Sequence, residues 1–272
     1  MCRMAAYIGE RPVPLSALAL EPEHSLLVQS YAPREMQSGV VNADGFGAGW
    51  YAPEVDPEPA VYRSVRPIWA DRSFASIAPR VLSPVVFAAV RSATPGLPAE
   101  ESGVPPFSAG RYMFMHNGAV EGFRRSAMRR LRGSLSDEAY AGLLGVSDSE
   151  TIFACLLDRL RGSPKDPEGA LAETVRFLFE TCAELGVGAA LNLGLTDGER
   201  AAFARCSTEG PGNSLYFLEG GRAFRGGVVV ASEPLDADPG WREVPDRHLL
   251  SAGRPGGVAL RPLELPGPGA PS

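Results

Sequence analysis

Short runs of apolar residues, bounded by glycine and proline, recur along the first half of the chain. They cover residues 3–8, 47–51, 85–90 and 112–115. Runs of this length with such boundaries are typical of β-strands. The same pattern returns after residue 188 and predicts further strands over 189–195, 201–206, 215–218, 228–231 and 258–260.

Between these two groups of strands the apolar positions change to helical spacing. The segment 147–150, Ser-Asp-Ser-Glu, has the pattern of a capping box, and apolar residues follow at Ile152, Phe153, Leu156, Leu157 and Leu160. A second helix is predicted over 168–184, with one apolar face and glycines at 186 and 188 to end it. The order of strands, helices and strands predicts an α+β fold with the helices segregated from antiparallel sheet.

Length and charge narrow the class of protein. A chain of 272 residues with 44% hydrophobic content is enough for one large domain with a full core. The net charge of -6, with no basic run longer than a doublet, argues against a nucleic-acid partner.

No segment resembles a leader or a membrane span of roughly 18 apolar residues, so we expect a soluble, cytoplasmic protein. We expect 266–272, rich in Pro and Gly, to be a flexible tail. The oligomeric state, a homo-oligomer included, stays open.

The cysteines and histidines do not predict a metal site or a disulfide framework. The four cysteines have no CxxC spacing, and the three histidines are isolated. No glycine-rich phosphate loop follows a strand, so we expect no metal and no cofactor. Cys155 and Cys182 fall within helical segments, where a thiol usually behaves as a small core side chain.

Cys2 differs from the other cysteines because it directly follows the initiator methionine. Removal of Met1 would leave a thiol beside a free α-amine. The ordinary pKa of an α-amine is about 7.7 to 8.0, so this group can take the thiol proton and later return it to a leaving amine. Cys2 is therefore a candidate nucleophile with its own base.

The segment His116-Asn117-Gly118 follows an apolar strand. At the end of a strand, an asparagine amide and a glycine N–H can point at one oxygen, as the oxyanion of a tetrahedral intermediate requires. Asn-Gly is also the commonest hairpin signal, so a plain turn stays open as an alternative.

Two charged residues could bind a substrate. Arg91, at the end of a buried strand, could hold a carboxylate through two parallel hydrogen bonds, or it could simply be solvated. Asp148, in the first turn of the predicted helix, could bind an ammonium group or could complement the helix dipole.

These segments occur in a distinctive order, with Met-Cys-Arg at the start followed by 42–51, 68–71, 90–94, 116–118 and 147–150. In this order they resemble the class II glutamine amidotransferases, a family of N-terminal-nucleophile hydrolases. The likeness continues through 231–235, 240–241 and 244–245, to about residue 252. It implies a single glutamine amidotransferase type-2 domain over residues 2–265. The family fold is an αββα sandwich, with two antiparallel sheets between two helical layers.

The resemblance also implies residue roles. Cys2 would be the nucleophile, and Asn117 and Gly118 would form the oxyanion hole. The residues implied to bind the glutamyl group are Arg91, Ser92, Thr94, His116 and Asp148. Phe46 and Trp50 are expected to pack the inner sheet. The joint retention of five residues argues against an inactive binding protein on the same scaffold: Cys2, Arg91, Asn117, Gly118 and Asp148.

The implied substrate is a small γ-glutamyl amide. The likeness is strongest to members that cleave γ-glutamyl-hercynylcysteine sulfoxide to glutamate and hercynylcysteine sulfoxide in ergothioneine biosynthesis. The alternative is a glutaminase subunit that passes ammonia to a separate synthase. A stand-alone hydrolase is favoured because only a Pro/Gly tail follows the last predicted strand.

The leaving amine is less well specified. Met4 and Pro105 stand where relatives often have histidine, which leaves the outer pocket and the leaving amine open. A bulky cationic leaving group would need an acidic or aromatic wall, for which the stretches near Trp50, Tyr51 and Trp69 are candidates.

Overall fold

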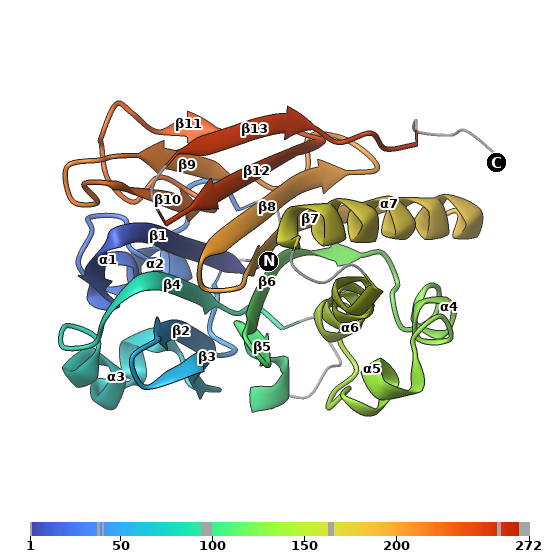
Figure 1. Ribbon diagram of the computed structural model, residues 1–272, viewed down its shortest axis with the longest axis horizontal. Coiled ribbons are helices and arrows are strands. Elements are labelled where there is room, and N and C mark those ends of the chain that lie inside the picture. The colour runs from blue at the N-terminus through green and yellow to red at the C-terminus, as the bar shows by residue number, and fades with distance from the viewer. Residues whose placement is uncertain are drawn as a thin grey trace.

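Two antiparallel sheets form the centre of the molecule (Figure 1). The computed structural model describes residues 2–36, 39, 41–93, 100–162, 166–254 and 257–266. Within these residues, a seven-stranded sheet has the order β11-β9-β10-β1-β4-β2-β3. Its strands are β1 (Arg3–Pro14), β2 (Phe46–Ala52), β3 (Asp56–Ser64), β4 (Leu82–Val90), β9 (Tyr216–Glu219), β10 (Gly227–Ala231) and β11 (Arg242–Glu243).

The second sheet of the described residues has six strands in the order β13-β12-β8-β7-β6-β5. Neighbouring strands in both sheets pair antiparallel. The strands of the six-stranded sheet are β5 (Phe107–Ala109), β6 (Tyr112–Val120), β7 (Ala189–Thr196), β8 (Arg200–Ser207), β12 (His248–Gly253) and β13 (Val258–Pro262).

Helices cover the outer face of each sheet. Figure 1 shows one group on the side of β1 and β4 and a second group on the side of β6 and β7. The first group is α1 (Ser16–Ala19), α2 (Leu26–Tyr31), α3 (Arg72–Ile77) and the 3₁₀ turn η1 (Ile68–Ala70). The second group is α4 (Met128–Arg132), α5 (Asp137–Ala141), α6 (Asp148–Gly162) and α7 (Pro167–Leu185), and a further 3₁₀ turn, η2 (Glu101–Gly103), precedes β5.

The period-two alternation of strand side chains separates three apolar layers. In β1, Met4 and Ala6 face the space between the sheets, where they pack with Met113 and Phe203. Ala5, the intervening residue, belongs to the layer under α1 to α3. The outer face of the six-stranded sheet packs on α6 and α7 in a third layer. These layers confirm the predicted αββα sandwich.

The structure confirms the predicted strands and both long helices, and it also contains elements that the pattern did not predict. β3 was missed because it is an edge strand with an exposed start and two prolines. β5, β11 and β12 are short strands that no apolar run indicated. The helices α1 to α5 have four to six residues, which is too short for a helical period to show in the sequence.

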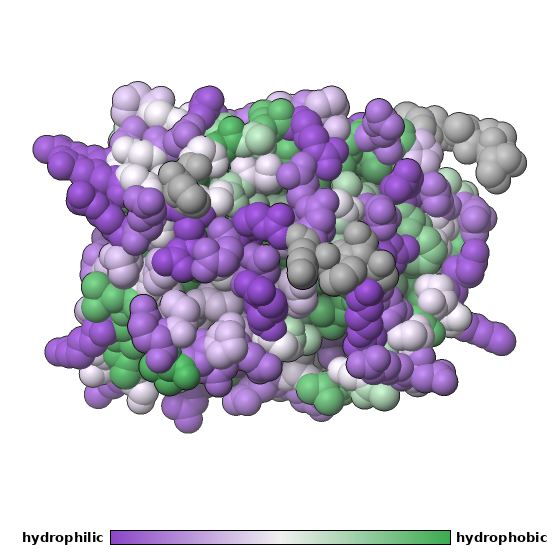
Figure 2. All heavy atoms as spheres, viewed as in Figure 1, coloured by the Kyte–Doolittle hydropathy of each residue, from purple (hydrophilic) through white to green (hydrophobic). Residues whose placement is uncertain are grey.

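The surface is mostly hydrophilic on the face that Figure 2 shows, and its hydrophobic residues form small separate groups. Among the described residues, no helix is both long and apolar enough to cross a membrane. Phe46 lies in the layer under the helices, and Trp50 packs against that layer. Both residues therefore pack the seven-stranded sheet, but on its helix-covered face and not between the sheets.

Candidate active site

Cys2 directly precedes β1, on the side that faces the other sheet. Strand alternation gives Cys2 the same orientation as Met4 and Ala6, which lie between the sheets. Cys2 is a partly buried residue. The pairing of β1 with β4 places Arg3 opposite Val90, so Cys2 lies beside the residues that follow β4. The Cys2 Sγ atom is 3.8 Å from the carbonyl oxygen of Ser92.

Arg91 directly follows β4 and is 5% exposed. Its main chain is fixed on both sides, since its N–H donates to Gly45 O at 2.8 Å and its carbonyl accepts from Asp44 N at 3.1 Å. The Arg91 Nη1 atom makes one longer bond, of 3.4 Å, to the carbonyl oxygen of Asp44. The carboxylate of Asp44 also accepts the N–H of Ala93 at 2.8 Å. Thr94, the next expected site residue, lies outside the described residues.

His116, Asn117 and Gly118 lie inside β6 and not in a turn. The strand continues to Val120 because the pairing with β7 continues, with Asn117 opposite Asn192. The turn alternative is therefore wrong, and the expected end of the strand lies two residues later than Gly118. A Cβ atom at Gly118 would lie 1.9 Å from the carbonyl oxygen of Ala190, so close strand packing requires glycine there.

The two polar side chains of this segment point to opposite faces of β6. Asn117, with 0% exposure, faces the other sheet, where its Nδ2 atom lies 3.2 Å from Ser232 Oγ. His116 faces the helices, and its Nδ1 atom lies 3.0 Å from the hydroxyl of Ser149. Asn117 thus shares the space between the sheets with Cys2, whereas His116 does not. His116 instead belongs to the contact between β6 and α6.

Asp148 is the first residue of α6, and its carboxylate links that helix to the end of β6. It accepts the N–H of Val120 at 3.1 Å and the N–H of Ser149 at 2.8 Å. Ser147 and Glu150 form the predicted capping box, since the N–H of Glu150 donates to Ser147 Oγ at 3.2 Å and the N–H of Ser147 donates to Glu150 Oε2 at 3.4 Å. The capping box fixes where α6 begins and therefore where Asp148 lies.

Burial and nearby charge decide the protonation states in this region. Burial raises the pKa of the Cys2 thiol, an effect that the positive charge of Arg91 opposes and the negative charge of Asp148 reinforces. Burial likewise lowers the pKa of His116, with Asp148 acting in the opposite direction. A thiol of raised pKa needs a base before it can attack, because the thiolate is the nucleophile.

A cavity of about 230 Å³ adjoins Arg91. Its other walls come from Glu100, Ser102 and Gly103, from residues 144–147 before α6, and from Glu150 in α6. Arg91 therefore lines this cavity together with two carboxylate side chains, those of Glu100 and Glu150.

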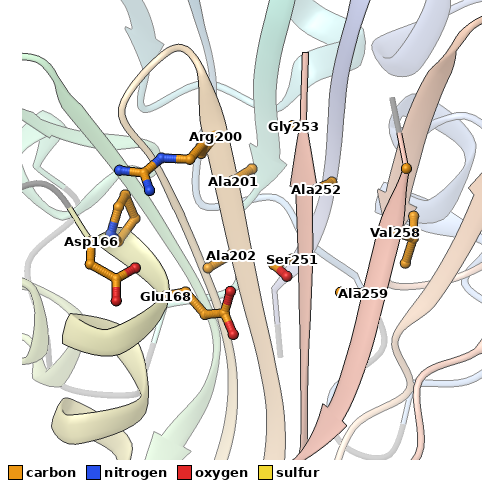
Figure 3. A pocket seen from close by; sticks show the side chains of 12 residues that line it. Asp166, Glu168, Arg200, Ala201, Ala202, Ser251, Ala252, Gly253, Val258 and Ala259 are labelled. Atoms are coloured by element: carbon orange, nitrogen blue, oxygen red, sulfur yellow. The ribbon is translucent and has the colours of Figure 1, made fainter. Parts of the chain in front are cut away.

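A second cavity, of about 380 Å³, lies between the start of α7 and the strands β8, β12 and β13 (Figure 3). It is lined in part by Ala201 and Ala202, which lie at the end of β8 opposite to Arg205. Arg205 is level with Asn192, which pairs with Asn117. This cavity is therefore separate from the region of Cys2.

Met4 and Pro105, the two departures from the family pattern, are both buried. Met4 packs between the sheets, and the carbonyl oxygen of Pro105 would lie 2.4 Å from a Cβ atom at Gly47. Tyr51 lies at the far end of β2 from Arg91, because Phe46 pairs with Val90 in the β2–β4 register. The intervening strand is roughly 15 Å long. Neither Trp50 nor Tyr51 is therefore a wall of the Cys2 region.

The sequence reasoning missed a buried polar network next to Cys2. Glu233, with 1% exposure, accepts from Arg3 Nε at 2.9 Å and lies 2.6 Å from His24 Nε2. The Nη1 atom of Arg3 in turn donates to the carbonyl oxygen of Cys2 at 3.1 Å. The one available signal was the segment 231–235, which belonged to the family pattern but had no role assigned to it.

Comparisons with known proteins agree with this fold. The family model for class II glutamine amidotransferases matches residues 17–225. A γ-glutamyl-hercynylcysteine sulfoxide hydrolase of Mycolicibacterium smegmatis is 39% identical over 97% of this chain and 100% of its own length. The hydrolase of the same name from Mycobacterium tuberculosis is 38% identical over 97% of both chains.

Solved structures show the same architecture. A glutamine aminotransferase class-II domain protein from Silicibacter pomeroyi has a TM-score of 0.72 and 29% identity, over 96% of this chain and 98% of that one. The phosphoribosylpyrophosphate amidotransferase of B. subtilis has a TM-score of 0.66 at 15% identity, and it matches 97% of this chain with 50% of its own, which shows the fold alone. The present chain therefore belongs to the class II glutamine amidotransferases.

Proposed function

We propose that this protein hydrolyses a γ-glutamyl amide by nucleophilic attack of Cys2, with γ-glutamyl-hercynylcysteine sulfoxide as its substrate. The observation that carries the proposal is the convergence of Cys2, Arg91 and Asn117, from three separate segments, at one end of the space between the sheets. The two mycobacterial relatives, named as hydrolases of that sulfoxide, support the choice of substrate.

The reaction begins once Met1 has been removed. The α-amine of Cys2 accepts the thiol proton, and the sulfur attacks the γ-carbonyl carbon of the substrate. The oxygen of the tetrahedral intermediate takes hydrogen bonds from the Asn117 amide and the Gly118 N–H. The α-ammonium then returns the proton to the leaving nitrogen, the carbon–nitrogen bond breaks, and a glutamyl thioester remains on Cys2. Water attacks the thioester, which releases glutamate and the free thiol.

The remaining residues of the proposal bind the glutamyl group. Arg91, which lines the cavity of about 230 Å³, pairs with the α-carboxylate, assisted by Ser92 and Thr94. Asp148 pairs with the α-ammonium, and His116, through Ser149, supports the start of the helix that carries Asp148. Because these contacts hold the substrate before and during the reaction, they contribute mainly to binding.

A cytoplasmic location is part of the proposal. The four cysteines are free thiols in the structure, as is usual in a reducing compartment.

The decisive experiment compares glutamate release from γ-glutamyl-hercynylcysteine sulfoxide with release from glutamine. We expect the sulfoxide to have the higher kcat/KM. Faster turnover of glutamine would favour the alternative, a glutaminase subunit that passes ammonia to a separate synthase. If the protein hydrolyses other bulky γ-glutamyl amides but not the sulfoxide, the mechanism stands and the substrate assignment is wrong.

A further inference from the structure

Ser232 and Glu233 directly follow β10, and both are buried, with 0% and 1% exposure. We propose that they are positioning residues for the reaction: Ser232 orients the amide of Asn117, and Glu233 acts through Arg3 to hold the main chain of Cys2. This inference rests on the proposed function of the same site. It gives the segment 231–235 a role in organising both the oxyanion donor and the nucleophile.

Ser232 links the strand of the nucleophile to the strand of the oxyanion donor. Its N–H donates to Met4 O at 2.9 Å, and its hydroxyl oxygen accepts the N–H of Met4 at 3.0 Å. The same hydroxyl oxygen lies 3.2 Å from Asn117 Nδ2. A single side chain thus sets the spacing between β1, which begins beside Cys2, and Asn117 on β6.

The other atom of the Asn117 amide explains why this contact matters. Asn117 Oδ1 is buried and has no hydrogen-bond partner. A half-turn of the amide about the Cβ–Cγ bond exchanges its oxygen and nitrogen at almost the same positions. In that orientation the Ser232 hydroxyl donates to Oδ1 while still accepting from Met4 N–H, so both of its hydrogen-bonding roles are used.

After this half-turn, Nδ2 occupies the position at which Oδ1 accepts no hydrogen bond. From this position the amide N–H can donate to the oxyanion of the intermediate. Ser232 is the residue that selects this orientation, because a hydroxyl that already accepts from Met4 donates best to an oxygen. An alanine at position 232 would leave the amide free to take either orientation.

Glu233 performs the corresponding task for the nucleophile. Its carboxylate takes the main-chain N–H groups of Arg34 and Glu35 at 2.8 and 3.1 Å, in addition to its contacts with Arg3 and His24. Burial by itself raises the pKa of Glu233, but the hydrogen bonds from His24, Arg34 and Glu35 and the charge of Arg3 outweigh it and lower the pKa to about 2. The carboxylate is therefore a fixed, ionised anchor for Arg3.

The anchor matters because Cys2 lies outside the paired part of β1, whose register with β4 begins at Arg3. Once Met1 is removed, Cys2 is a chain end, and chain ends are poorly ordered unless another contact holds them. The bond from Arg3 Nη1 to the carbonyl oxygen of Cys2 supplies such a contact.

A double-mutant cycle tests the role of Ser232. We expect Ser232→Ala to lower kcat by ~10-fold, less than loss of the whole donor, with KM changed by no more than about two-fold. In an Asn117→Ala background, Ser232→Ala should cause no further loss, because its effect passes through Asn117. Ser83→Ala is the matched control, since Ser83 is fully buried and its hydroxyl bonds the main chain of Tyr51, away from Cys2. This control should change thermal stability without changing kcat.

A second pair of variants tests Glu233 and Arg3. Arg3→Lys keeps the charge but removes the planar fork, and we expect kcat to fall by ~10-fold with KM nearly unchanged. Glu233→Gln should act in the same direction. Glu243→Gln is the control, because Glu243 also pairs with a buried arginine, Arg205, at 2.6 Å but has no contact with Cys2 or Arg3 among the described residues. It should retain full kcat.

The outcomes separate this inference from the proposed function. If the wild-type protein releases glutamate but Ser232→Ala and Arg3→Lys keep its kcat, the inference is overturned and the proposed function stands. Additive losses in the Ser232/Asn117 cycle also overturn the role of Ser232, because they show a separate structural effect. If the wild-type protein releases glutamate from no γ-glutamyl amide, the proposed function fails and this inference fails with it.

Discussion

The two ends of the space between the sheets differ in how completely their polar groups are hydrogen-bonded. At the end away from Cys2, the hydroxyl of Tyr51 donates to Arg111 O at 2.6 Å, and Ser83 Oγ both accepts from Tyr51 N and donates to Tyr51 O. At the end near Cys2, the Oδ1 atom of the buried Asn117 amide has no hydrogen-bond partner. The same two sheets thus form one end where these polar groups have hydrogen-bond partners, which we call the saturated end, and one end where a buried polar atom lacks a partner.

The difference shows how a packed sandwich can hold a reactive site. Buried polar groups are normally paired, because an unpaired one costs about 1–3 kcal/mol. The saturated end follows that rule, and it stabilises the fold. The end near Cys2 departs from the rule at Asn117, whose Oδ1 atom has no partner, and the proposed function gives this amide a role in binding the reacting oxygen. Substitutions at the two ends should therefore change different measured quantities.

The largest effect is expected from the nucleophile. Cys2→Ala should lower glutamate release by at least ~10⁴-fold, because no other group can form the thioester. Cys206→Ala is the control, since Cys206 is a buried strand cysteine whose pKa burial raises and whose thiol contacts Leu191 O. It should retain activity. A Cys2→Ala variant that turns over substrate would end the proposed mechanism.

The next effect concerns the base. Protein that retains Met1 should be slower by ~10²–10⁴-fold, the usual contribution of general base catalysis. Intact-mass measurement of the purified protein shows which form is present. In the mature form, kcat/KM should rise with pH through about 7.7 to 8.0, because the α-amine must be neutral to accept the thiol proton. Full activity of protein whose measured mass includes Met1 would contradict the role of the α-amine as the base.

Asn117→Ala should lower kcat by ~10²–10³-fold with a smaller change in KM, because the charge that the amide meets develops only in the transition state. Steady-state kinetics on the best γ-glutamyl amide measure both constants. A change in KM alone would remove Asn117 from the oxyanion hole.

Binding residues should give smaller effects. Arg91→Lys and Asp148→Asn should raise KM by ~10–100-fold, corresponding to the loss of one charge-assisted hydrogen bond. The inhibition constant for free glutamate should rise by the same factor, which gives a second measurement. If kcat falls while both binding constants stay unchanged, these residues do not form the clamp.

The smallest effect is on the free energy of unfolding. Its pH dependence should differ between the two ends of the space between the sheets. Glu233 has a folded pKa of about 2, below its ordinary 4.5, so its contribution to the free energy of unfolding is present above pH 4.5 and is lost as the pH falls toward 2. Burial raises the pKa of Tyr51, so its contribution is present below its ordinary pKa of 10 and is lost at higher pH. Denaturant unfolding should show a loss of roughly 2–3 kcal/mol at acid pH that Glu233→Gln reduces. Tyr51→Phe should reduce only the alkaline loss.

The strands and the two long helices could be predicted from the sequence alone, and the candidate site residues could be proposed from it. These features are local: an apolar period, the capping box at Ser147 and the order of short motifs can be read without knowing what packs against what. Cys2 could be proposed as the nucleophile for the same reason, because the proposed chemistry depends on its place directly after Met1.

The tertiary structure alone decided how these residues work together. Asn117 and Gly118 have the sequence of a turn, but pairing with β7 keeps them in the middle of a strand, where alternation directs Asn117 toward the other sheet. The contacts of Ser232 with Asn117 and of Glu233 with Arg3 join residues more than a hundred positions apart. Such polar contacts have no period in the sequence, because they depend on which strand ends the fold brings together.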